Sequence, residues 1–158
     1  MRRFLFPILI FSLPANAYNK PVEKNYFASL RADKVNVRAG PGSAYPIKFT
    51  YNLRKLPIKV ISEYDNWSEI EDFEGSSGWI NQNLITKRRT ILVKTKRKSV
   101  NIYAKPSDKS KTLLRLENKV VADFLKCTYQ YCAIKIAGEK GWINKKEIWG
   151  VNENDFSN

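Results

Sequence analysis

The stretch VNVRAGPG at residues 35–42 recurs in altered form as VNIYAKPS at residues 100–107, an offset of 65. A second matching stretch, GWIN, stands at residues 78–81 and again at 141–144, an offset of 63. Self-similarity at a nearly constant spacing indicates two copies of one structural unit, and short deletions in the second copy explain the change in offset.

Each copy spans only about 50 to 55 residues, close to the lower size limit for a domain with its own core. Within both copies, short apolar and β-branched segments alternate with polar or glycine-containing turns, a pattern typical of β-strands. The predicted strands are residues 47–53, 57–64, 67–70 and 78–81 in the first copy and residues 112–116, 119–126, 131–136 and 140–143 in the second. No stretch sustains the period of an amphipathic helix. The pattern predicts an all-β chain made of two small β-barrels, a form that also leaves few strand edges open.

Several residues of the first copy resemble the bacterial SH3 domain (SH3b), whose motif is an N-V-R-x-G-P-G turn followed by two tryptophans. The matching residues are 35–42, Tyr45-Pro46, Trp67 and Gly78-Trp79-Ile80. More widely, residues 33–152 resemble exported bacterial proteins with tandem SH3-like domains and no catalytic domain. The resemblance implies two five-stranded SH3-like barrels, and it implies peptidoglycan as the ligand usually suggested for SH3b modules.

The repeat and the local composition divide the chain into six segments. We expect a signal peptide (residues 1–17), an N-terminal extension (18–30), a first SH3b-like barrel (31–86), a basic connecting segment (87–98), a second SH3b-like barrel (99–152) and a C-terminal tail (153–158). Because Thr90-Ile91-Leu92-Val93 is apolar and β-prone, we expect the connecting segment to contain a strand.

The N-terminus has the three parts of a secretory signal peptide. Arg2 and Arg3 form a basic start, residues 4–13 are largely apolar, and Ala15-Asn16-Ala17 supplies small residues for cleavage. An uncleaved membrane anchor is the alternative, but this apolar run is much shorter than the roughly 20 residues that a spanning helix needs. We therefore expect cleavage after Ala17, export to the periplasm or cell surface, and no transmembrane anchor in the mature chain.

Cys127 and Cys132 are the only two cysteines of the chain. In an oxidising compartment such a pair persists as a disulfide, and a hairpin turn between two strands would bring the cysteines within bridging distance. A redox-active pair is the alternative, but the spacing is not Cys-x-x-Cys, and a metal site would need more ligands. The sequence therefore predicts a structural disulfide in the second barrel.

The turn that follows Arg38 is the first place to look for a ligand site. Gly40 and Gly42 can adopt positive φ and Pro41 has a restricted φ, so the requirements of a sharp turn explain these three residues. Arg38 and Tyr45 flank the turn but are not required by it. They are therefore better candidates for contact with a ligand.

The tryptophans are the second group of candidates. Trp67, Trp79 and Trp142 could line a shallow groove, since exposed aromatic rings stack on sugars and on proline-rich peptides. The alternative is core packing, because a tryptophan fills a large part of so small a barrel. The ligand-binding candidates are Arg38, Tyr45, Trp67 and Trp79. The altered turn VNIYAKPS leaves a binding role of the second copy open.

The net charge of +13 is concentrated in one segment. Residues 87–98 contain no acid and seven basic side chains: Lys87, Arg88, Arg89, Lys94, Lys96, Arg97 and Lys98. Such a run attracts polyanions, which for an exported protein are anionic envelope surfaces such as lipid headgroups, lipopolysaccharide or wall phosphates. Pairing with the six acids between residues 63 and 74 is the internal alternative. We expect no nucleic-acid partner, because the protein is exported and the segment lacks interleaved aromatics.

The chain has no histidine, which removes Ser-His-Asp and Cys-His catalysis, histidine-ligated metals and histidine pH switching. Glu69 and Glu71 share a face if their strand is extended, but nothing organises a hydrolytic site around them. We expect a non-catalytic module, without cofactor or metal, that recognises peptidoglycan or another envelope component. The alternative is a scaffold that binds another envelope protein, such as a wall enzyme on a separate chain.

Overall fold

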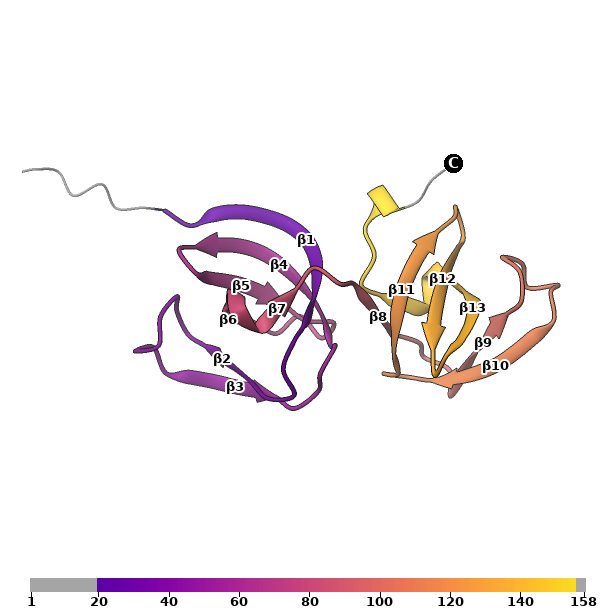
Figure 1. The fold of residues 1–158 in the computed structure, drawn as a ribbon, viewed down its shortest axis with the longest axis horizontal. Helices are drawn as coiled ribbons and strands as arrows, with labels where there is room; N and C mark the ends of the chain where they lie inside the picture. The colour runs from indigo at the N-terminus through magenta and orange to yellow at the C-terminus, as the bar shows by residue number, and fades with distance from the viewer. Residues whose placement is uncertain (1–19, 156–158) are drawn as a thin grey trace, which may run out of the picture.

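The computed structural model describes residues 20–155 and confirms the prediction of an all-β chain. Two seven-stranded antiparallel sheets, each curled on itself, lie side by side (Figure 1). The predicted signal peptide and its cleavage site lie outside the described residues. Within residues 20–155 the helical segments are single 3-10 turns, and none is long and apolar enough to cross a membrane.

The first sheet holds the strands between residues 22 and 86 in the spatial order β3-β2-β6-β5-β4-β1-β7. Its elements are β1 (Val22–Leu30), β2 (Val35–Arg38), β3 (Ile47–Tyr51), β4 (Pro57–Tyr64), β5 (Trp67–Glu71), β6 (Ser77–Asn81), the 3-10 turn η1 (Gln82–Leu84) and β7 (Ile85–Thr86).

The second sheet repeats this order as β10-β9-β13-β12-β11-β8-β14. Its elements are β8 (Thr90–Val93), β9 (Ser99–Tyr103), β10 (Thr112–Glu117), β11 (Val121–Cys127), β12 (Tyr131–Ile136), β13 (Glu139–Asn144), the 3-10 turn η2 (Lys145–Glu147) and β14 (Ile148–Trp149), followed by η3 (Glu153–Asp155). Every strand of the first sheet has a counterpart seven places later, which confirms the internal repeat.

Each sheet has seven strands instead of the five that the resemblance implied. The additional members are a strand that enters the barrel, β1 or β8, and a two-residue strand, β7 or β14, that pairs with it. β1 lies in the predicted N-terminal extension and pairs with β4 over six residue positions. β8 lies in the predicted connecting segment and pairs with β11, so the predicted strand at 90–93 is confirmed.

The GWIN stretch holds the middle of each sheet together at its glycine. A Cβ atom on Gly78 would lie 2.5 Å from Val37 Cγ1, and one on Gly141 would lie 2.4 Å from Ile102 Cγ2. Because real side chains do not approach so closely, only glycine allows β6 and β13 to pass over the neighbouring strands at this distance. The same contact at both positions explains why the glycine of GWIN is unchanged between the copies.

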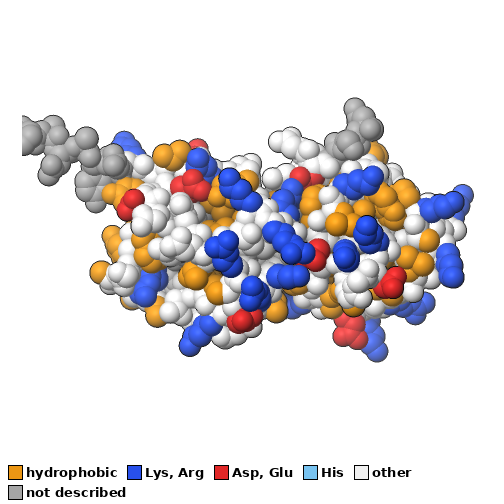
Figure 2. Space-filling model, in the orientation of Figure 1, with side chains coloured by type: hydrophobic (Ala, Val, Ile, Leu, Met, Phe, Trp, Pro, Cys, Tyr) orange, Lys and Arg blue, Asp and Glu red, His pale blue; other side chains and the backbone are white. Residues whose placement is uncertain are grey.

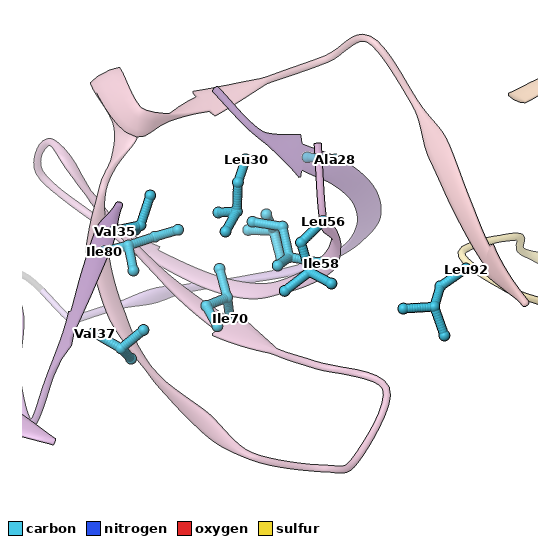
Figure 3. Close-up of a cluster of buried hydrophobic side chains, with 10 residues drawn as sticks. Ala28, Leu30, Val35, Val37, Leu56, Ile58, Ile70, Ile80 and Leu92 are labelled. Atoms are coloured by element: carbon cyan, nitrogen blue, oxygen red, sulfur yellow. The ribbon is translucent and has the colours of Figure 1, made fainter. Parts of the chain in front are cut away.

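Each barrel has its own buried hydrophobic core. Alternation along β2 puts Val35 and Val37 inside while Asn36 and Arg38 face outward, as the two-residue period of a strand requires. Figure 3 shows the first core, where the side chains of β1, β2, β4, β5 and β6 converge. One member of this cluster, Leu92, comes from β8 of the second sheet.

Strand β8 is buried along its whole length and serves both barrels. Ile91 and Val93 belong to the second core, whereas Leu92 between them belongs to the first. The Thr90 hydroxyl donates to the Lys55 carbonyl oxygen at 2.6 Å and is also hydrogen-bonded to the Ser29 hydroxyl at 2.7 Å. Since adjacent residues of a strand point to opposite faces, one short strand joins the two cores.

An aromatic contact reinforces this junction. The Phe27 ring of β1 meets the Trp149 ring of β14 edge to face, with 4.8 Å between the ring centroids. Edge-to-face pairs of this kind stabilise by about 1 kcal/mol beyond the area they bury. The two barrels therefore contact each other through packed side chains as well as through the chain that connects them.

The predicted disulfide is present between Cys127 at the end of β11 and Cys132 near the start of β12. The two residues face each other in the strand pairing, and their Cα atoms are 4.0 Å apart. The bond closes the turn that exposes Tyr129, and it is typical of proteins that fold outside the reducing cytosol.

We predict that the two barrels unfold in a single transition and that Leu92→Ala destabilises both. Removing the fully buried Leu92 side chain leaves a cavity in the first core and should cost about 2 to 4 kcal/mol. Denaturant unfolding followed by tryptophan fluorescence measures this. Leu125→Ala, the same change at an exposed position of β11, should cost little. Two separate transitions in the unsubstituted protein would contradict the shared strand.

Candidate ligand-binding site

The turn between β2 and β3 has the same backbone as its counterpart in the second barrel. The first turn has three backbone hydrogen bonds: Ala39 N to Pro46 O, Gly42 N to Gly40 O and Tyr45 N to Gly42 O. The second turn has the same three bonds 65 positions later: Ala104 N to Lys111 O, Ser107 N to Lys105 O and Ser110 N to Ser107 O. The second copy makes this turn without either glycine. The backbone of the turn therefore does not require glycine at these two positions.

The two glycines instead make room for the Tyr45 ring. Neither Gly40 nor Gly42 has a positive φ, so the conformational reason proposed from the sequence is wrong. A Cβ atom on Gly40 would lie 2.4 Å from Tyr45 Cε1, and one on Gly42 would lie 3.3 Å from Tyr45 Cδ2. The ring rests on the turn, yet Tyr45 is still 46% exposed.

The second copy lacks both the tyrosine ring and the two glycines of this turn. Ser110 stands where Tyr45 stands in the first copy, and its hydroxyl accepts a hydrogen bond from the Lys105 backbone N–H at 3.1 Å. Without a ring over the turn, side chains at positions 105 and 107 meet no obstacle. The glycines of the first copy are thus linked to the exposed tyrosine.

We predict that Gly40→Ala destabilises the chain by about 1 kcal/mol, because the added methyl group displaces the Tyr45 ring. The same substitution in a Tyr45→Ser background should cost much less, since serine leaves the space open. Denaturant unfolding of the four proteins in this double-mutant cycle gives the coupling directly. Equal costs in both backgrounds would show that Gly40 is required by the backbone and not by the ring.

A shallow pocket of about 290 Å³ lies beside this turn on the first barrel. Its lining residues are Lys34, Asn36, Arg38, Ser43, Trp67, Asn81 and Leu84. Arg38 and Trp67, two of the four predicted ligand contacts, lie here together. The Arg38 guanidinium also donates to the Tyr45 carbonyl oxygen at 2.7 Å, so the side chain of Arg38 is held against the turn.

Strand register explains why these side chains share a face. Arg38 of β2 faces Trp79 of β6, and Trp67 of β5 faces Asn81 of the same strand β6. Directly opposed residues of paired strands project to the same side of a sheet. Trp79 is only 8% exposed, so most of its ring packs against protein, whereas Trp67 is partly open to solvent.

The second barrel has a pocket at the equivalent place, with a volume of about 280 Å³. All seven positions that line the first pocket also line the second. The first pocket has, in chain order, Lys34, Asn36, Arg38, Ser43, Trp67, Asn81 and Leu84. The second pocket has, in the same order, Ser99, Asn101, Tyr103, Asp108, Tyr131, Asn144 and Glu147. Two asparagines are retained and the other five residues differ. A pocket at this place is therefore a property of the barrel, whereas its chemistry is particular to each copy.

The sequence alone did not identify a binding site in the second copy, although the residues of this pocket follow from the alignment of the two repeats. The tyrosines Tyr103 and Tyr131 contact each other edge to face, with ring centroids 6.2 Å apart. Asp108 and Glu147 introduce acids where the first pocket has none. The second copy lacks the glycines of the turn motif, so the motif did not point to a site there. The pocket is nevertheless present, because it lies beside the turn and does not depend on the glycines.

Comparison with family models finds the bacterial SH3 domain twice, at residues 31–87 and 96–150. The chain belongs to the bacterial SH3 domain family. The two matches cover most of the chain, and each takes in all strands of one sheet except its first, β1 or β8, so each barrel contains a bacterial SH3 domain. A comparison with curated proteins finds no match.

Comparison with solved structures finds distant similarity. NlpC1 from Trichomonas vaginalis is 12% identical with a TM-score of 0.37, and the match covers 87% of this chain and 48% of NlpC1. An NlpC/P60 family protein from Bacillus cereus is 14% identical with a TM-score of 0.35, covering 78% and 55%. The CBD of the endolysin LysPBC5 is 19% identical with a TM-score of 0.33, covering 84% and 97%. The chain thus spans about half the length of the NlpC-type proteins, and the fold assignment rests on the family match and the strand pairing.

The basic segment between the two SH3 domains is partly neutralised by acids of the second domain and of η3, which follows that domain. Arg88 pairs with Asp123 at 3.1 Å, Arg97 pairs with Glu147, and Arg89 pairs with Asp155. Among residues 20–155, none of the six acids between residues 63 and 74 pairs with residues 87–98. Lys94 reaches the first domain, but it donates to the Phe73 carbonyl oxygen. No ion pair of the described residues uses Lys87, Lys96 or Lys98.

Arg89 has a structural role and is not a free cation. Its guanidinium donates to Asp155 and to the Gly150 carbonyl oxygen, and it lies over the Phe124 ring at 4.5 Å. Burial alone would raise the pKa of Asp155. Three interactions oppose this effect and hold the pKa below its ordinary value: the hydrogen bond from Arg89, the hydrogen bond from the Asn152 backbone N–H, and the positive charge of Arg89. The pair fixes η3 against the second domain.

We predict that Asp155→Asn lowers the free energy of unfolding at neutral pH by about 2 kcal/mol, the value of hydrogen bonds to a charged group. A carboxyl group whose pKa is lowered in the folded state stabilises the fold above its unfolded pKa, and this contribution disappears as the pH falls through the folded pKa. The difference between the two proteins should therefore shrink below about pH 4. Glu153→Gln in the same 3-10 turn is the control, and a difference that is constant with pH would contradict the ion pair.

Asp72 of the first domain also has structural partners. Asp72 is buried and accepts hydrogen bonds from the Tyr51 hydroxyl and from the backbone N–H groups of Glu74 and Ser76. Burial raises the pKa of Tyr51, and the hydrogen bond to Asp72 raises it further. Among the described residues, no group of three His, Cys, Asp or Glu side chains could hold a metal ion.

Proposed function

We propose that the chain is a non-catalytic module that binds the bacterial cell wall, with peptidoglycan as its ligand and the first-domain pocket as the contact surface. The observation that carries this proposal is the grouping of Lys34, Arg38 and Trp67 in one open pocket. Cationic side chains suit the carboxylates of wall peptides, and an indole ring suits the face of a sugar. Membership of the bacterial SH3 domain family supports the same conclusion.

The four predicted contacts have different roles in this proposal. Arg38 and Trp67 meet the ligand inside the pocket, and Tyr45 extends the surface from its exposed position on the turn. Trp79 acts mainly from beneath, because its ring is almost completely buried. We place the protein in the periplasm or on the cell surface, where the wall is accessible and the Cys127–Cys132 bond persists.

A protein partner in the envelope is the second candidate function. The first sheet ends in the edge strand β3, and two large apolar side chains are exposed there: Ile47 on the strand, at 49%, and Leu53 just after it, at 46%. An edge strand with exposed apolar neighbours suits the addition of a strand from another chain. This arrangement fits a scaffold that holds a wall enzyme.

We predict that the purified protein co-sediments with isolated peptidoglycan and that Trp67→Ala combined with Tyr45→Ala weakens this binding by about tenfold or more, as loss of aromatic anchors does. Part of the binding through the pocket should persist at raised salt concentration, because the ring contacts of Trp67 and Tyr45 are not screened, whereas the charge contacts of Lys34 and Arg38 are. Tyr129→Ala is the matched control: Tyr129 is an exposed aromatic residue that lines neither pocket.

Two outcomes would contradict peptidoglycan binding. One is a protein that stays in the supernatant at low salt. The other is a Trp67 and Tyr45 double variant that folds normally by circular dichroism and sediments like the unsubstituted protein. If the chain is retained on envelopes only until their proteins are removed, and digestion of the glycan has no effect, the scaffold function is supported instead.

A further inference from the structure

A groove of about 830 Å³ lies where the two domains meet. The β5–β6 turn of the first domain contributes Phe73 and Glu74, and the remaining lining residues belong to the basic connecting segment and to the second domain. Five lining residues are basic: Lys94, Lys96, Arg97, Lys119 and Lys146. The groove shares no residue with the first-domain pocket, so it is a separate feature of the molecule.

The acids of the groove are already occupied. Glu74 pairs with Lys119 at 2.8 Å, and Glu147 pairs with Arg97. Lys96 and Lys146 are exposed, and no ion pair within residues 20–155 uses either of them. Lys94 donates a hydrogen bond to a neutral carbonyl group, which leaves the lysine charge uncompensated. A concave surface with this excess of positive charge concentrates anions.

The groove continues into the pocket of the second domain. Arg97, Lys146 and Glu147 line both cavities. Beyond them, the pocket presents the tyrosines and asparagines described above, which offer hydroxyl and amide groups. One trough therefore leads from a cationic end to a polar end that carries hydroxyl and amide groups and one further acid, Asp108, and we call it the interdomain trough.

The walls of this trough are held in place before any ligand binds. Lys94 follows directly after β8, whose residues are buried in both cores. Lys119 donates its backbone N–H to the Val93 carbonyl oxygen at 2.7 Å, so the turn that carries Lys119 is tied to the same strand. On the face shown in Figure 2, Lys and Arg side chains gather where the two domains meet. A preorganised site loses less entropy on binding than a flexible one.

We propose that the interdomain trough binds an acidic glycan. The acidic groups of the sugar chain lie among Lys94, Lys96 and Lys146, and its neutral hydroxyl groups contact the second-domain pocket. Charge alone would suit any polyanion, but the adjoining tyrosine and asparagine side chains are donors and acceptors that sugars use. This site is independent of the proposed peptidoglycan contact on the first domain.

Isothermal titration calorimetry of the full chain lacking residues 1–17 tests the proposal with polygalacturonate, a carboxylated sugar polymer. We expect binding, and we expect Lys96→Gln with Lys146→Gln to weaken it about tenfold, as loss of two partly exposed charge contacts would. Lys111→Gln with Lys135→Gln removes the same charge at exposed positions outside the trough and should leave affinity nearly unchanged. Neutral pullulan should not bind, and polyphosphate should bind more weakly than polygalacturonate.

Three results would overturn the proposal. They are absence of binding to polygalacturonate, an equal loss in the two double variants, and polyphosphate binding at least as tight as polygalacturonate. Peptidoglycan co-sedimentation distinguishes failure of this proposal from failure of the proposed function. We expect the Trp67 and Tyr45 substitutions to weaken that co-sedimentation and the Lys96 and Lys146 substitutions to leave it nearly unchanged.

Discussion

The structure depends on one strand that is buried on both faces. β8 gives Leu92 to the core of the first domain and Ile91 and Val93 to the core of the second, and the Thr90 hydroxyl bonds to both Ser29 and Lys55. Each SH3 domain is close to the minimum size for an independent core, so a shared strand adds buried apolar surface that neither domain has alone. The same strand fixes the two domains side by side, and the groove between them follows from that arrangement.

The two domains have diverged in side chains while keeping one backbone. The turn before β3 and the turn before β10 make the same three hydrogen bonds, although one contains two glycines and the other contains lysine and serine at those positions. In the first domain the glycines accommodate the Tyr45 ring, and in the second a Ser110 hydroxyl takes its place. A pocket persists beside each turn, with basic and indole groups in the first and phenol and acidic groups in the second. Duplication thus supplies two equivalent places for a ligand with different chemistry in each.

The position of each residue in the fold determines which cations of the basic segment form ion pairs. Arg88, Arg89 and Arg97 meet acids that lie far away in the sequence, at positions 123, 155 and 147. The lysines of the same run have no such carboxylate partners among the described residues. Arg89 is mostly buried, and its planar group bonds both carboxylate oxygens of Asp155, whereas Arg88 and Arg97 are largely exposed and each contact their carboxylate through one nitrogen. The run therefore contributes both to holding the second domain together and to the positive surface between the domains.

The sequence by itself determined the all-β class, the two copies, the strand at 90–93 and the disulfide, because short apolar periods, a repeat and a cysteine pair are local patterns. It also brought forward Arg38 and Trp67, which lie in one pocket, and Trp79, whose burial no local pattern reveals. Only the tertiary structure decided that Leu92 belongs to the neighbouring domain's core, that Gly40 and Gly42 make room for the Tyr45 ring, and that Arg89 is an internal ion-pair partner. The physical reason is the same in each case: these roles depend on which distant residues pack together, and packing is set by the closed sheets and by how the two domains meet.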